Sequence, residues 1–75
     1  MRSLANVPVG TSTRVEDIQG SDAIARRLLE MGLTPGATIR VVSEAPLGGP
    51  MEIEVRGYRL SVRRREAACV DVAIS

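Results

Sequence analysis

Arginine is the dominant reactive or charged residue type in this chain, and the partners needed for most enzyme chemistry are missing. Lysine and arginine together number 10, all of them arginine, and there is no histidine. A nucleophile needs an adjacent general base, and histidine and lysine, two of the usual choices, do not occur. We therefore predict no enzymatic activity and no resident cofactor.

The residues that could bind a metal ion are also sparse. Glu52 and Glu54 lie two positions apart on one predicted strand, about 7 Å from each other, so they would need further ligands from elsewhere to hold a hard cation. Solvated glutamates are the simpler interpretation, because Arg59 is expected opposite Glu54. Cys69 is the single cysteine, so it forms no internal disulfide and no thiolate-rich metal site.

The strongest charge cluster is Arg63, Arg64 and Arg65, with Arg56 and Arg59 nearby. A solvated surface is the simplest interpretation, because exposed ion pairs contribute little to stability. The alternative is an acidic protein partner, since a guanidinium makes bidentate contacts with carboxylates. Nucleic acid is disfavoured as a partner, because the net charge is only +1 and aromatic residues make up 1% of the chain.

Apolar residues in unusual places supply the remaining candidates for partner binding. Leu47 lies in the loop 44–50, between prolines and glycines, where it either folds back over the core or anchors a partner. Leu29 lies between the apolar and polar sides of the predicted helix, so it belongs either to the core or to a docking patch with Leu33 and Leu47. A polyproline groove is rejected, because Tyr58 is the only aromatic residue and is predicted to be in the core.

One convincing helix positions several of these residues. Ile24, Leu28 and Met31 recur at helical spacing, and either Ser21 or Asp22 can cap the first turn. Gly32 is predicted to end the helix in a left-handed Schellman motif that pairs Leu28 with Leu33. Thr34-Pro35-Gly36 then predicts a type II turn into a strand.

The rest of the chain predicts short strands. Alternation indicates strands at 13–18, 37–42, 51–55, 58–62 and 70–74, with an irregular or edge segment at 1–12 and a single 3₁₀ turn at 64–68. The third and fourth form a hairpin that pairs Val55 with Tyr58, Glu54 with Arg59 and Ile53 with Leu60. Its connection is either the two residues Arg56-Gly57 or a longer loop with a glycine bulge.

These elements favour a mainly β fold: a small SH3-like barrel of about five strands, with one short helix between the first two. The length of 75 residues predicts a single domain over 1–75. No apolar run approaches the roughly 20 residues that cross a bilayer, and no secretory signal is recognisable. We expect a cytoplasmic protein with no direct membrane insertion.

Three segments in order carry a family resemblance. They are Arg27–Gly36 (RLLEMGLTPG), Ala45–Pro50 (APLGGP) and Arg64–Ala67 (RREA), the last followed by Val70 and Val72. Together they resemble the FeoA family of ferrous iron transport accessory proteins. The resemblance implies an SH3-like domain in the bacterial cytosol that supports or regulates a FeoB-type membrane iron transporter with a GTPase domain. Because the chain opens with Met1 and shows no helix-turn-helix region, the stand-alone form is expected.

The resemblance transfers no binding site, so the predicted surface comes from the residues themselves. It comprises Leu29, Leu33, Pro46, Leu47, Arg63, Arg64 and Arg65. The alternatives are a direct carrier of Fe²⁺ or another divalent metal, disfavoured because oxygen ligands alone bind Fe²⁺ with little selectivity, and a small nucleic-acid-binding barrel. Exposed Leu47 and short edge strands leave weak self-association open.

Overall fold

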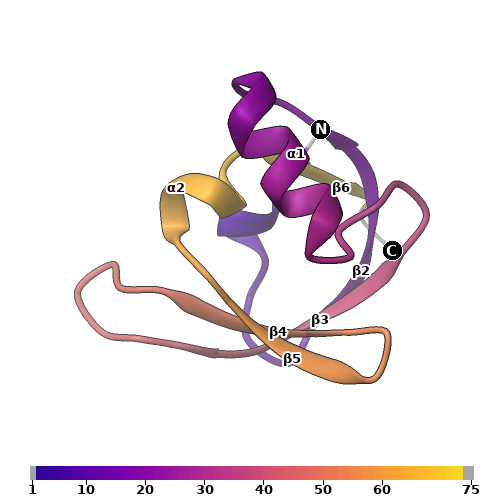
Figure 1. Ribbon diagram of the computed structural model, residues 1–75. Helices are drawn as coiled ribbons and strands as arrows, with labels where there is room; N and C mark the ends of the chain where they lie inside the picture. The colour runs from indigo at the N-terminus through magenta and orange to yellow at the C-terminus, as the bar shows by residue number, and fades with distance from the viewer. Residues whose placement is uncertain (1, 74–75) are drawn as a thin grey trace.

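The computed structural model describes residues 2–73 and consists mainly of short antiparallel strands (Figure 1). The elements in chain order are β1 (Arg2–Ser3), the 3₁₀ turn η1 (Leu4–Asn6), β2 (Ser12–Ile18), α1 (Asp22–Glu30), β3 (Thr38–Glu44), β4 (Met51–Val55), β5 (Tyr58–Val62), α2 (Arg64–Ala67) and β6 (Val70–Ala73). In Figure 1, α1 and α2 lie above the β3, β4 and β5 strands. The predicted mainly β fold is confirmed.

The six strands form one sheet in the order β1-β6-β2-β3-β4-β5. The sheet has one strand more than the predicted five, because Arg2 and Ser3 pair with Val72 and Asp71 of β6 and form β1. We expected barrel closure to remove the sheet edges, but the hydrogen-bonded order of the described residues ends at β1 and at β5. Ile74, predicted to belong to the last strand, lies outside the described residues.

The β4–β5 hairpin has the predicted register, with Val55 opposite Tyr58, Glu54 opposite Arg59 and Ile53 opposite Leu60. Its connection is the two-residue option, and both central residues have positive φ, 52° at Arg56 and 85° at Gly57. This is the pattern of a type I′ turn.

Two details of the hairpin differ from prediction. Arg59 forms its ion pair with Glu52 at 3.4 Å rather than with Glu54, because its side chain reaches diagonally across the strands. Tyr58 is not a core residue: it is 44% exposed, and its hydroxyl donates to the Met31 carbonyl at 2.7 Å, a surface group at the end of α1.

Helix α1 begins and ends as predicted. The Ser21 hydroxyl is the cap, and it accepts a hydrogen bond from the Ile24 N–H at 3.3 Å. At the other end, the N–H of Leu33 donates to the Leu28 carbonyl at 3.1 Å while Gly32 has φ of 98°. These contacts define the Schellman motif, and its apolar pair of Leu28 and Leu33 is fully buried.

The predicted turns around α1 and α2 have mixed outcomes. The Thr34 carbonyl accepts a hydrogen bond from the Ala37 N–H at 2.9 Å, and Gly36 has φ of 93°, as a type II turn requires. The segment after β5 is an α-helical turn rather than the predicted 3₁₀ turn, since Ala67 N–H donates to the Arg63 carbonyl four residues back at 2.9 Å. A buried carboxylate, described below, supports this wider turn.

The core contains the side chains that alternate inward from the strands, closed from above by the helix. Its large members, all fully buried, are Leu4, Val15, Leu28, Leu33, Ile39, Val41, Met51, Ile53, Val55, Val62, Val70 and Val72. Leu4 belongs to η1, a 3₁₀ turn within the segment 1–12 that was predicted to be an irregular or edge strand.

Candidate functional site

The loop between β3 and β4 is a tight turn that holds Leu47 in solvent. The Gly49 N–H donates to the Pro46 carbonyl at 3.3 Å, and the two residues between them have positive φ, 60° at Leu47 and 73° at Gly48. Leu47 has a relative exposure of 104%, so its side chain contacts no core residue. The partner-anchor alternative for Leu47 therefore keeps its structural basis, and the fold-back alternative is wrong.

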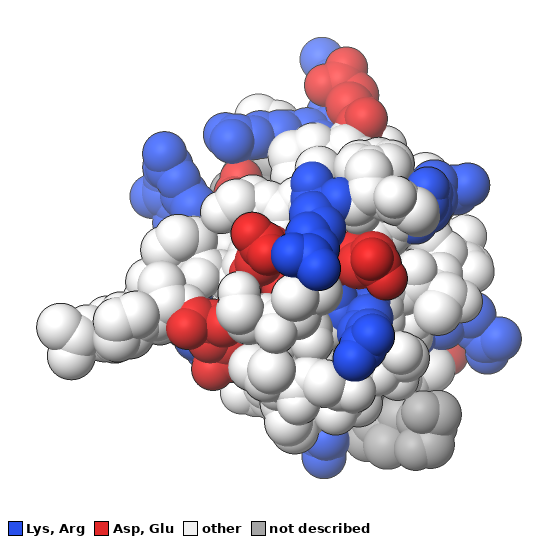
Figure 2. Space-filling model, turned by 90° about the horizontal axis from the view of Figure 1, so that it is seen from below, with Lys and Arg blue, Asp and Glu red and all other residues white. Residues whose placement is uncertain are grey.

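Short contacts limit the shapes that this loop can adopt. The Ala45 N–H donates to the Pro50 carbonyl at 3.0 Å and closes the base of the loop. A Cβ at Gly49 would lie 2.7 Å from the Ala45 Cβ, closer than side chains tolerate. The loop projects from the body of the molecule at the left of Figure 1. The projection at the left of Figure 2 shows only uncharged residues.

Leu29 and Leu33, the two candidate leucines near the end of α1, differ in burial. Leu29 is 41% exposed, so it remains available at the surface. Leu33 is fully buried, because the Schellman motif turns its side chain onto Leu28 inside the core. The predicted patch of Leu29, Leu33 and Leu47 is therefore corrected: Leu33 is a core residue.

The three consecutive arginines do not act as one cluster. Arg63 and Arg65 are exposed. Arg64 is half-buried, and its guanidinium donates to the Ala5 carbonyl at 3.2 Å and pairs with Glu44 at 3.7 Å. Basic and acidic side chains are interspersed on the face shown in Figure 2. This face therefore lacks the uniformly positive surface that nucleic-acid binding would require.

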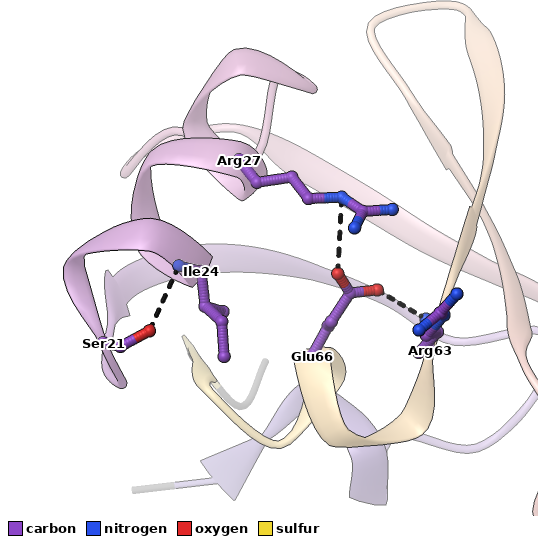
Figure 3. Close-up of polar contacts among 5 residues, drawn as sticks. All are labelled: Ser21, Ile24, Arg27, Arg63 and Glu66. Carbon is purple, nitrogen blue, oxygen red and sulfur yellow. Dashed lines mark hydrogen bonds and ion pairs between the residues drawn. The ribbon is translucent and has the colours of Figure 1, made fainter.

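A buried carboxylate links α1 to α2, and the sequence analysis missed it. Glu66 is 5% exposed; its Oε1 accepts the Arg63 backbone N–H at 3.0 Å, and its Oε2 lies 3.5 Å from Arg27 Nε (Figure 3). A glutamate at the third position of a helical turn commonly returns to the N–H of the cap residue. That spacing from Arg63 to Glu66 was the available signal.

Arg27, Arg63 and Arg64 meet at an open surface pocket of about 390 Å³, which we call the arginine pocket. It is lined by Arg27 of α1, Gly48, Gly49 and Pro50 of the loop, Ser61 of β5, and Arg63, Arg64 and Glu66 at and in α2. The pocket thus joins the turn that carries Leu47 to two of the three predicted arginines. Arg65 is not among its lining residues.

The described part of the chain contains neither a cluster of metal-binding side chains nor a membrane-spanning helix. Within residues 2–73, no three side chains of cysteine, aspartate or glutamate converge as a metal site would require. No helix in this range is long and apolar enough to cross a bilayer.

The fold and this surface define a small SH3-like domain. Solved structures support that class: FeoA of Stenotrophomonas maltophilia in complex with zinc, described as a prokaryotic SH3 domain protein, is 38% identical, with a TM-score of 0.85 over 97% of this chain and 91% of that one. The chain belongs to the FeoA family, because the model of the FeoA domain matches residues 2–74. The predicted family and SH3-like fold are thereby confirmed, and the family is one of ferrous iron transport.

Two further relatives extend the comparison. An FeoA-like protein of Clostridium acetobutylicum is 30% identical, with a TM-score of 0.89 over 96% of this chain and 84% of that one. A fusion protein of Fe²⁺ transport protein A and the Fe²⁺ transporter FeoB from Porphyromonas gingivalis is 34% identical over 71 residues. That match covers 95% of this chain and 8% of the fusion protein.

Proposed function

We propose that this chain is a cytoplasmic accessory protein of ferrous iron uptake that binds a FeoB-type transporter and catalyses no reaction itself. The observation that carries the proposal is the Porphyromonas gingivalis relative, in which a homologous segment is fused to a FeoB transporter. Fusion keeps two polypeptides at high effective concentration, which benefits domains that must contact each other. Domains that contact each other in this way do so through a complementary surface.

The surface that we assign to this contact contains Leu47 and Pro46 beside the arginine pocket. Leu29 is exposed as well, but it lies roughly 200° around α1 from Arg27, so it is left out of this surface. A leucine side chain gains about 1.5 to 3 kcal/mol when it leaves water, and the fully exposed Leu47 gains nothing of this within its own chain. A rigid turn that presents such a side chain loses little entropy when a partner covers it. Arg63 extends the surface with exposed positive charge, whereas Arg65, although exposed, does not line the arginine pocket and is left out of the assigned surface.

A leucine-to-aspartate change at the turn tests this surface. Leu47→Asp should weaken binding to the cytosolic part of the cognate transporter at least tenfold, because the apolar gain on binding is lost. The stability of the domain should change little, since Leu47 has no contact with the core. Affinity is measured by biolayer interferometry, and stability by thermal unfolding.

Val9→Asp is the matched control, because Val9 is another exposed aliphatic side chain among residues 2–73, at 52%, and it does not line the arginine pocket. The control should bind like the wild type. Equal affinity of the wild type and Leu47→Asp would refute the assigned surface. Absence of any binding by the wild type would refute the proposed partner.

A direct Fe²⁺ carrier is the competing hypothesis, and it makes a different prediction. Anaerobic calorimetric titration of the domain with Fe²⁺ should show no micromolar site under the binding hypothesis, because carboxylates scattered over the surface chelate weakly. Saturable micromolar binding of one ion per chain would favour the carrier instead.

A further inference from the structure

The arginine pocket carries an excess of positive charge that the contacts among residues 2–73 do not neutralise. Its guanidinium groups belong to Arg27, Arg63 and Arg64, and the carboxylates that contact them belong to Glu66 and Glu44. Both oxygens of Glu66 already have contacts, at 3.0 Å to the Arg63 N–H and 3.5 Å to Arg27. The group therefore holds one positive charge more than its carboxylates balance.

Hydrogen-bond donors also remain unused around the pocket. Arg64 Nε is buried, and within residues 2–73 it has no hydrogen-bond partner. Arg27 contacts Glu66 through Nε, and Figure 3 shows its guanidinium extending past Glu66 toward Arg63. Arg63 contributes its backbone N–H to Glu66, so its guanidinium is not needed for that contact. Buried donors without a partner are uncommon in folded proteins, so the chain satisfies the Arg64 guanidinium only in part.

We propose that the arginine pocket binds the carboxylate of an aspartate or glutamate in an acidic segment of the partner protein. This inference rests on the proposed function and specifies the chemistry of the contact. One carboxylate balances the single excess charge, whereas a phosphate dianion would overcompensate it beside buried Glu66. The planar guanidinium fork matches a carboxylate with two parallel hydrogen bonds.

The loop residues beside the pocket define what must flank that acidic residue. Gly48 and Gly49 have no side chains, so a partner backbone can approach the pocket closely over them. Leu47, next to Gly48, is fully exposed on the same turn. The bound segment is therefore an acidic residue with an apolar residue close in sequence, the first held by the arginines and the second packed on Leu47.

The test uses overlapping 15-residue peptides that tile the soluble part of the cognate transporter, with fluorescence polarisation against the full chain. Arg63→Gln is the diagnostic variant, because the structural contact of this residue uses its backbone alone. Arg65→Gln is the matched control, since it removes the same charge two residues away and does not line the pocket. Each binding peptide is also made with its acidic residues changed to the corresponding amides.

We expect an acidic peptide to bind the wild type and Arg65→Gln equally and to bind Arg63→Gln roughly tenfold more weakly. The amide version of the peptide should bind the wild type more weakly by a similar factor. Arg63→Gln should bind this amide version no more weakly than the wild type does. Equal weakening by Arg63→Gln and Arg65→Gln would overturn the pocket, as would tighter binding of a phosphopeptide than of its carboxylate counterpart.

The failures of the two proposals are distinguishable in the same experiment. If the intact transporter binds but Arg63→Gln leaves that affinity unchanged, the carboxylate site is refuted and the proposed partner survives. If neither the intact transporter nor any of its peptides binds, the proposed function is refuted. The carboxylate inference falls with it, because it rests on that partner.

Discussion

At the scale of single residues, Leu47 combines two unfavourable features. Its backbone has φ of 60°, a region that costs an ordinary L-residue roughly 1 to 2 kcal/mol, and its side chain is fully exposed to water. No contact of the Leu47 side chain with the core of the described structure offsets either feature. Function is the simplest physical reason for retaining a leucine at this position, because asparagine before glycine suits a type I′ turn better.

Leu47→Asn should therefore stabilise the domain by about 0.5 to 1 kcal/mol, which raises the melting temperature of a domain this small by roughly 2 to 8 °C. The gain arises because asparagine tolerates left-handed φ and no buried contact is lost. Calorimetric thermal unfolding measures it. The same change should weaken transporter binding, so stability and affinity move in opposite directions.

Arg56→Asn is the comparison for this prediction. Arg56 also has positive φ, 52°, at the first position of a type I′ turn. Its guanidinium, however, donates to Thr34 Oγ1 at 2.7 Å and approaches the Gly32 carbonyl at 3.5 Å. The gain from Arg56→Asn should be smaller than that from Leu47→Asn, and a lower melting temperature for Leu47→Asn would contradict the assigned strain.

At the scale of elements, the end of α1 is joined to the β4–β5 hairpin through a glycine that accommodates a tyrosine. Gly32 has φ of 98°, and a Cβ at this position would lie 2.6 Å from the Tyr58 hydroxyl oxygen. That hydroxyl in turn donates to the Met31 carbonyl at 2.7 Å, one of the carbonyls freed at the helix end. The glycine is thus required both by its backbone and by its neighbour.

Gly32→Ala should destabilise the domain by more than Gly36→Ala. Gly36 has a similar φ of 93°, but a Cβ there would meet nothing within 4 Å, so this variant reports the backbone cost of roughly 1 to 2 kcal/mol by itself. The excess at Gly32 measures the steric contact with Tyr58. Urea unfolding of both variants gives the two free energies.

Tyr58→Phe tests the origin of that excess. In the wild type it should cost about 0.5 to 1.5 kcal/mol, because a hydrogen bond to the Met31 carbonyl is lost. In the Gly32→Ala background it should cost less or stabilise, because the oxygen that opposes the new Cβ is removed. An equal cost in both backgrounds would show that the two residues are not coupled.

At the scale of the whole molecule, the sheet has two open ends, and β5 is the longer of the two edge strands. In a hairpin with a two-residue turn, the pair next to the turn exchanges both hydrogen bonds, and pairs alternate from there. The N–H groups of Tyr58, Leu60 and Val62 therefore face β4, whereas those of Arg59 and Ser61 face the open edge.

Native-state hydrogen exchange should accordingly show slow amides at Leu60 and Val62 and fast amides at Arg59 and Ser61 in dilute solution. The same measurement tests weak self-association, which remains a prediction. If copies of the chain pair through this edge, protection at Arg59 and Ser61 will rise with protein concentration. Strong protection of these two amides at micromolar concentration would contradict an open edge in the monomer.

The sequence by itself determined the local structure of this protein. The Gly32 stop, the Gly36 turn and the β4–β5 register were predicted correctly, and Ser21 was one of two predicted caps, because each depends on side-chain types close together in the chain. The family resemblance was likewise readable from short segments in order. The glutamate that returns to Arg63 followed a local rule and was nevertheless missed.

Only the tertiary structure decided which candidates share a surface. It buried Leu33, brought Tyr58 to the end of α1, tied Arg64 to Ala5 and placed Arg27 beside Arg63 and Glu66. These outcomes join residues far apart in the chain, and their geometry depends on how helix and strands pack around a common core. Sequence periodicity shows which side of an element faces inward, but not which other element meets its outer side.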